Sequence, residues 1–168
     1  MRSIIVFIWI TFLFSSCVDL GFDTPQPEGY PDIALFPTEW LGTYISDEDT
    51  LVIKPYSVLV EKDSVYFNLN AENLVLRKFQ NWYILNLKEP EKDYWTVFCA
   101  RLKGDKLTVK VPSIDEDDKK ALEKQFEVNE SYNSNGNVDA YIIHPTPKQW
   151  KKLLKSKFFS SNNYVRQR

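Results

Sequence analysis

The feature that most constrains the fold is a series of short segments in which apolar and polar residues alternate. Leu107, Val109 and Val111 alternate with polar residues, and Val65 and Phe67 do the same. This period of two is typical of a strand with one buried face. Eight strands are predicted in this way, over residues 40–46, 50–54, 57–61, 64–69, 74–79, 82–87, 94–102 and 106–111.

Short turn segments separate these strands, which favours an antiparallel meander. A twisted sheet of this size closes into a barrel or splits into two packed layers. Two further strands are expected over residues 126–130 and 138–144. We therefore predict a mainly β fold, an antiparallel meander closed as a barrel of roughly 8–10 strands, with a β-sandwich as the alternative.

A short surface helix is predicted over residues 115–124. Ser113 and Glu116 fit a capping box, and acidic residues fill the first turn, where the helix dipole favours negative charge. The run Asp115 to Asp118 also suggests calcium, but a calcium loop spaces its ligands and needs a glycine at its turn. The run is therefore interpreted as a helix start.

A C-terminal amphipathic helix is predicted over residues 148–159, with Thr146 as its cap and Pro147 at its first position. Its apolar face contains Trp150, Leu153, Leu154 and Phe158. This helix is expected to plug one end of the barrel or to pack on its side. A basic amphipathic helix can also lie in an anionic membrane interface, which is the alternative.

The start of the chain is typical of an export signal. Arg2 is followed by an apolar run over residues 4–14 and then by two serines and Cys17. A charged start, an apolar run and small residues are the parts of a secretory signal. The run is too short for a permanent transmembrane helix, which needs about 20 apolar residues.

The end of this segment resembles the lipobox of bacterial lipoproteins, in which a bulky apolar residue and two small ones precede a cysteine. The residues are Phe14, Ser15, Ser16 and Cys17. The resemblance implies that the Cys17 thiol takes a diacylglycerol and that the new amino terminus is acylated, for example with palmitate. Several acyl chains make a stable membrane anchor. An ordinary signal peptide that leaves Cys17 as a plain cysteine is the alternative.

Such an anchor implies a place in the bacterial cell envelope, on the outer membrane, with the periplasmic and surface faces both open. Four prolines and several acidic residues follow Cys17, which favours an extended tether. The predicted parts are a signal peptide (1–16), a lipidated N-terminus with a Pro-rich tether (17–37), a single barrel domain (38–159) and a polar tail (160–168).

Composition excludes one class of partner and leaves one cysteine to explain. The formal net charge is −2 and charges of both signs are interspersed, so the chain lacks the basic footprint of a nucleic-acid binder. In an exported protein the two cysteines first suggest a disulfide. If Cys17 carries lipid, Cys99 has no partner and is expected to be a buried apolar side chain.

Residues that could carry catalysis are few. His144 is the only histidine, so a nucleophile–histidine site would have to use it, and a structural or surface role is expected instead. A zinc site would need more His and Cys ligands than the chain contains. No catalytic residue, metal ligand or cofactor is predicted.

Two short segments resemble the Asp-(Ser/Thr)-aliphatic acceptor for O-glycosylation of exported proteins in some Gram-negative bacteria. They place Thr50 and Ser64 as the acceptors, each directly after an aspartate. The alternative is turn chemistry, in which the aspartate closes a turn before a strand. An intact mass equal to the lipidated chain alone would dismiss the modification.

The segment Trp40 to Tyr44 resembles the first strand of small lipocalin-like lipoproteins, with its aromatic–Gly–aromatic order. The resemblance implies a barrel whose interior is filled or holds a small apolar ligand. Three functions follow. The first is a non-enzymatic, membrane-anchored module that binds a small apolar ligand or an envelope protein. The second is an inhibitor or immunity-type protein that masks a hydrolase or toxin, and the third is an enzyme of unknown class.

Overall fold

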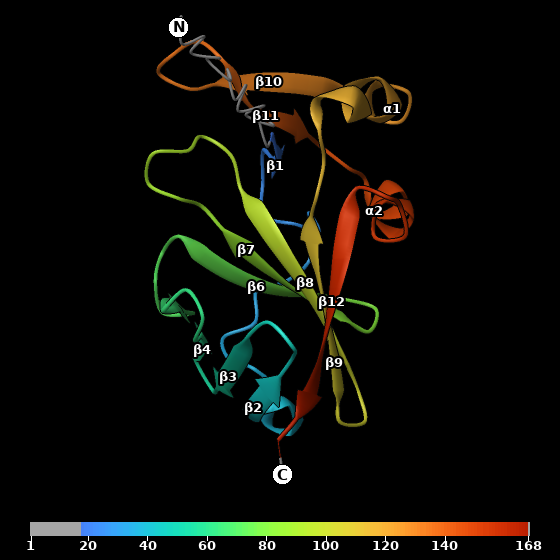
Figure 1. Cartoon of the computed structure of the whole chain (residues 1–168). Helices are drawn as coiled ribbons and strands as arrows, with labels where there is room; N and C mark the ends of the chain where they lie inside the picture. Colours follow the sequence, from blue (N-terminus) through green and yellow to red (C-terminus); the bar gives the residue numbers. More distant parts are fainter. Residues whose placement is uncertain (1–17, 168) are drawn as a thin grey trace, which may run out of the picture.

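The computed structural model describes residues 18–167, so Cys17, the predicted lipid attachment site, lies outside the described residues. Its main element is a nine-stranded antiparallel sheet with the order β5-β4-β3-β2-β12-β9-β8-β7-β6, curled into a nearly closed barrel (Figure 1). The strands are β2 (Gly42–Ile45), β3 (Thr50–Lys54), β4 (Ser57–Val60), β5 (Val65–Asn68), β6 (Leu74–Phe79), β7 (Trp82–Leu87), β8 (Thr96–Lys103), β9 (Lys106–Pro112) and β12 (Phe159–Arg166). The predicted mainly β barrel is therefore confirmed.

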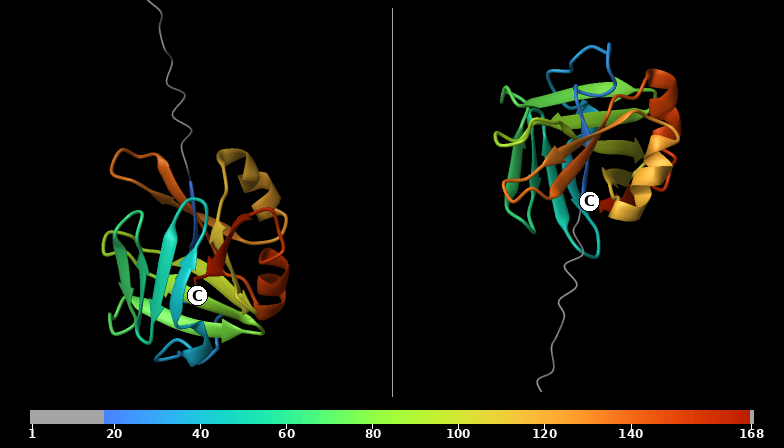
Figure 2. Two further views of the ribbon diagram at one scale, coloured as in Figure 1. Left: turned by 60° about the horizontal axis from the view of Figure 1, so that its bottom comes forward. Right: turned by 90° about the horizontal axis from the view of Figure 1, so that it is seen from above.

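A second layer packs against the outside of the barrel (Figure 2). It contains a three-stranded sheet with the order β1-β11-β10, in which β1 runs parallel to β11. Its elements are β1 (Asp19–Phe22), η2 (Glu116–Asp118), α1 (Lys119–Glu123), β10 (Val128–Tyr132), β11 (Val138–Ile143) and α2 (Pro147–Leu153). A short 3-10 helix, η1 (Thr38–Trp40), precedes β2 in the barrel.

The two layers enclose two separate hydrophobic cores, one inside the barrel and one between the barrel and the second layer. Strand β8 contributes to both cores because successive side chains of a strand point to opposite faces. Val97 and Cys99 are fully buried in the outer core, whereas Phe98 and Ala100 pack in the inner one. This strand has a continuous apolar run because both of its faces are buried.

Cys99 should resist thiol reagents in the folded protein. Burial raises the pKa of its thiol, and the thiolate is the reactive form. In a Cys17→Ser variant, Cys99 is the only thiol, and intact-mass analysis should show no iodoacetamide adduct in native buffer and one adduct in denaturant. Rapid native labelling would show instead that β8 opens to solvent.

The prediction of a polar tail over residues 160–168 is wrong, because this segment forms most of β12. The strand pairs with β9 from Phe159 to Val165 and with β2 through Val165 and Arg166. It therefore joins two four-stranded meanders, β2–β5 and β6–β9, that do not otherwise pair with each other. Residues 160–163 at its centre are all polar, so the strand has no alternation of apolar and polar residues by which it could be predicted.

The barrel has a seam between its edge strands β5 and β6. Every neighbouring pair in the nine-stranded sheet is antiparallel, so the first and last strands run in the same direction. A parallel pair needs a crossover connection of about a dozen residues, whereas residues 69–73 alone join β5 to β6. The seam is therefore left without a hydrogen-bonded ladder.

The prediction of a tether over residues 18–37 is also wrong, because the domain begins at Val18. Val18, Leu20 and Phe22 are buried in the outer core, and β1 pairs with β11. Further along the segment, Phe36 is buried in the inner core. The period of two in residues 18–22 is the strand signal, and the prolines that follow it obscured that signal.

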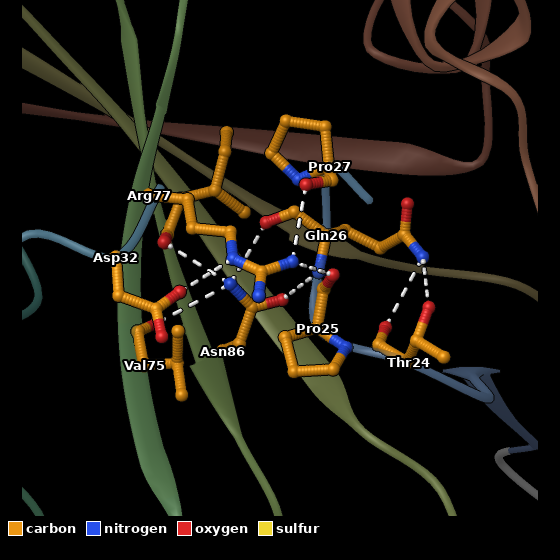
Figure 3. A network of polar contacts seen from close by, with 9 residues as sticks. Thr24, Pro25, Gln26, Pro27, Asp32, Val75, Arg77 and Asn86 are labelled. Atoms are coloured by element: carbon orange, nitrogen blue, oxygen red, sulfur yellow. Dashed lines mark hydrogen bonds and ion pairs between the residues drawn. The ribbon is translucent and has the colours of Figure 1, made fainter. Parts of the chain in front are cut away.

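Polar contacts fix the rest of this segment to the outside of β6 and β7 (Figure 3). The Asn86 amide accepts from the backbone N–H of Gln26 at 2.6 Å and donates to its carbonyl oxygen at 2.9 Å. Arg77 forms an ion pair with Asp32 at 2.8 Å and donates to the Pro27 carbonyl at 3.1 Å. Asn86 is fully buried, so these bonds satisfy polar groups that water cannot reach.

Both predicted helices are present, with changes at their ends. The first is capped by Asp115 and Asp118 rather than by Ser113 and Glu116. The second has the predicted capping box of Thr146 and Gln149, but it ends at Leu153.

The apolar face of α2 packs on the side of the barrel, one of the two predicted positions. Trp150 is fully buried, with its ring centroid 5.3 Å from that of Phe22. Because this face lies inside the protein, it is not free to enter a membrane interface.

Candidate ligand-binding site

The interior of the barrel contains a cavity of about 300 Å³. Strands from both meanders line it with their inward faces, as the alternation of Leu107, Val109 and Val111 predicts. Its aromatic wall consists of Phe36, Trp40, Phe67, Tyr83, Phe98 and Tyr164. This volume is at the lower end of the range for small-molecule sites, which runs from about 300 to 1,000 Å³.

The aromatic rings of the wall support one another in pairs. Trp40 and Tyr83 meet edge to face with centroids 4.7 Å apart, and Phe67 and Phe98 are 5.5 Å apart. Such pairs favour defined ring positions beyond the effect of apolar burial alone. The Phe67–Phe98 pair also connects β5 to β8 across the interior of the barrel. The wall of the cavity is therefore a set of mutually packed rings.

One end of the barrel is closed by Tyr44. This side chain is fully buried, and its hydroxyl donates to the Trp40 carbonyl oxygen at 2.9 Å. Arg166 donates from Nε to the same hydroxyl at 3.2 Å, and its guanidinium also contacts the Glu39 carbonyl oxygen. The strand β12 thus brings its last residue across the end of the barrel that holds η1.

Polar residues line the cavity at its mouth. Asp63 and Asn162 line both the cavity and an adjoining polar cleft formed by the β2–β3 and β4–β5 turns. Tyr164 lies between the two spaces, and burial raises the pKa of its hydroxyl, with Asp49 and Glu48 adding to the effect. An apolar interior with a few polar groups at its entrance is suited to an amphipathic or apolar small molecule.

The structure supplies the site residues that the sequence did not identify. No ligand-binding residue was predicted, because the pattern of inward apolar residues is the same whether their side chains fill the barrel or leave a cavity. The available signal was a small residue among large ones on an inward face. Ala100 is such a residue, between Phe98 and Leu102 on β8.

His144 lies on the surface, as expected, and links the segment that follows β1 to the end of β11. Its Nδ1 is 2.7 Å from an Asp23 carboxylate oxygen, and its Nε2 is 2.9 Å from a Glu28 oxygen. Across residues 18–167, no three His, Cys, Asp or Glu side chains are grouped so that they could hold a metal ion. His144 therefore acts as a pair of hydrogen-bond donors when it is protonated.

The contribution of His144 to stability should fall as pH rises. The hydrogen bond to Asp23 raises the pKa of His144 above its ordinary value of 6.5, and the charge of Glu28 adds to this. The pairing therefore stabilises the fold below pH about 6.5 and is lost as pH rises through the raised pKa. Because the groups are exposed, the effect is expected to stay below about 1 kcal/mol.

The measurement is urea unfolding of the wild type and a His144→Ala variant from pH 5.5 to pH 9. The stability difference should be largest at the acid end and vanish at the alkaline end. A His144→Lys variant serves as the control, because its side chain stays charged over this range. The difference in stability between His144→Lys and His144→Ala should therefore not depend on pH. A constant difference between wild type and His144→Ala would contradict the assignment.

The two candidate glycosylation sites lie at or beside turns: Thr50 begins β3 directly after the β2–β3 turn, and Ser64 lies in the β4–β5 turn. Asp49 accepts from the backbone N–H groups of Thr50 and Lys62, at 2.7 and 2.9 Å, which is the alternative turn chemistry. Ser64 is exposed and has a φ of 53°. The modification of Thr50 and Ser64 stays a prediction.

No protein family, curated protein or solved structure was found to match this chain. None of the helices described within residues 18–167 has the length and apolar character needed to cross a membrane. The cavity and the sequence of the first 17 residues are therefore the features that bear on function.

Proposed function

We propose that this chain is a lipid-anchored, non-enzymatic protein of the bacterial cell envelope that binds a small apolar ligand inside its barrel. The cavity of about 300 Å³, with its aromatic wall, is the observation that supports ligand binding. Burial of apolar surface supplies the affinity, at roughly 25 cal/mol per Å² removed from water before the costs of association.

The anchor is supported by the order of residues at the start of the chain. A charged residue, an apolar run and the lipobox-like residues 14–17 lead to Cys17 as the lipid attachment site. The proposed place is the outer membrane, on its periplasmic or surface face. Replacement of Cys17 by Ser should abolish incorporation of labelled palmitate and move the protein from the membrane to the soluble fraction. Unchanged fractionation would reject the anchor.

Ligand binding is tested by titration of the purified chain with a fluorescent apolar probe whose emission rises in an apolar site. The expected result is saturable binding of one probe per chain, lost when urea unfolds the protein. Native mass spectrometry of protein taken from its own membranes should show the bound small molecule directly. Absence of saturable binding would reject the cavity as a ligand site.

The exposed edge strand β5 favours the second candidate, an inhibitor or immunity-type protein that masks an envelope hydrolase or toxin. This strand pairs only with β4, and Tyr66 on it is 60% exposed. An unpaired edge can add a strand from a partner. A Tyr66→Lys variant separates the candidates, because it should weaken capture of a protein partner and leave binding of the apolar probe unchanged.

A further inference from the structure

The first described residue lies beside the mouth of the cavity. Val18 forms an antiparallel bridge with Ile114, which follows the end of β9. Val111, near that end of β9, lines the cavity. Two residues separate Val111 from Ile114 in the sequence, so their Cα atoms are at most about 11 Å apart. Val18, which follows Cys17 in the sequence, therefore lies within reach of the end of β9 that lines the cavity.

A surface depression connects the two features. Asp19 and Leu20 line it, and it shares Phe98 and Val111 with the cavity. Leu20 is buried in β1, so this strand forms a fixed edge of the depression. Figure 1 shows β1 at the end of the molecule opposite the C-terminus, and the C-terminal strand reaches the closed end of the barrel. The open end and the start of β1 thus share one side of the molecule.

The short connection between Cys17 and the domain limits how far the cavity mouth can lie from the membrane. Val18 is buried and β1 begins at Asp19, so Cys17 stands only two residues before a strand that is part of the domain. A flexible tether would let the mouth point in any direction and stand tens of ångströms from the bilayer. A lipid on Cys17, as proposed above, would hold the domain at the membrane surface on the side where β1 begins.

The charge of the rim limits the kind of head group that fits. The polar cleft beside the mouth contains Asp47, Glu48 and Asp63, and Lys62 is its basic residue. Like charges across a binding site disfavour a ligand, so an anionic head group is opposed here. The apolar interior accepts a hydrocarbon chain.

The geometry points to a neutral single-chain amphiphile as the ligand, taken by the barrel directly from the membrane in which Cys17 is anchored. This inference rests on the proposed function. A chain that slides from the bilayer interior into an apolar cavity avoids water, so proximity to the membrane controls the rate of loading. The affinity itself is set by the cavity and is independent of the anchor.

The experiment increases the distance between the lipid attachment site and the cavity mouth. A flexible Gly/Ser segment of about 20 residues, with a mean span of roughly 25 Å, is inserted between Cys17 and Val18. A matched control carries the same segment after Arg168, where it does not part the mouth from the lipid. The acylated proteins are placed in phosphatidylcholine vesicles that contain a pyrene-labelled fatty alcohol, and uptake is followed by energy transfer from tryptophan.

The unmodified protein and the control should load at the same rate, and the insertion variant should load about tenfold more slowly. All three should bind the probe in detergent-free solution with the same Kd. Equal loading rates with equal Kd values would overturn membrane loading and leave the proposed ligand binding intact. Absence of probe binding in all three would reject both.

Discussion

The Phe22→Ala variant is expected to lose about 3–5 kcal/mol of unfolding free energy. Phe22 is 0% exposed, and its ring meets Trp150 edge to face in the core between the barrel and the second layer. Its backbone also pairs with Trp95, through N–H···O contacts of 2.9 and 2.7 Å. Removal of the ring leaves a cavity that this tightly packed core cannot fully close. Urea unfolding followed by circular dichroism measures the loss.

A Leu35→Ala variant is the matched control, because Leu35 lies in the same segment and is 44% exposed. Its loss should be within about 0.5 kcal/mol, as for most surface changes. If Phe22→Ala were equally mild, residues 18–37 would be the loose tether that the prolines suggest. The pair of variants therefore tests where the domain begins.

The Ala100→Phe variant is expected to weaken binding of the apolar probe at least about tenfold, equivalent to roughly 1.4 kcal/mol. Ala100 lines the cavity, and the added ring would occupy space that the ligand needs. Because the ring enters a space that is already present, the cost of overpacking should be small. A titration of wild type and variant with the same probe gives the ratio of the Kd values.

An Ala71→Phe variant adds the same ring on the surface, since Ala71 is exposed in the loop between β5 and β6. Its probe affinity should equal that of the wild type. Unfolding curves of both variants show whether the fold is kept. Undiminished binding by a folded Ala100→Phe protein would place the ligand outside the barrel.

The strands that the sequence pattern indicates most clearly are those whose two faces differ. Leu107, Val109 and Val111 all point into the barrel, and the opposite face of β9 is polar, so the alternation indicated both strand and face. Strand β3 has the predicted limits for the same reason, whereas β6 and β7 have apolar residues on both faces and were delimited by the turn residues between them. Barrel closure followed from the number of strands, because a sheet of this size curls.

The two missed strands were missed for different reasons. The centre of β12, residues 160–163, is polar on both faces, and its place in the sheet is set by backbone pairing with β9. Strand β1 is short, and its partner β11 lies at the far end of the sequence, so nothing local indicates the pair. Pairing between distant segments is tertiary information that single-segment patterns do not contain.

The site was less predictable than the fold because it depends on volume. Phe67 lies on an alternating apolar face that the sequence shows, but whether its ring and that of Phe98 fill the barrel depends on the barrel radius. The contacts of His144 with Asp23 and Glu28 join segments that are likewise distant in sequence. The lipid on Cys17 stays a prediction from sequence.

The position of β12 determines the order in which the molecule can assemble. The two meanders contain only hairpin neighbours, so each can form as soon as its own strands are available. Their union waits for Phe159–Arg166, which follows every other strand of the barrel in the sequence. Strand β1 must likewise wait for β11. A chain arranged in this way stays incompletely folded until segments from its two ends are both available, because each sheet takes one of its strands from a distant part of the sequence.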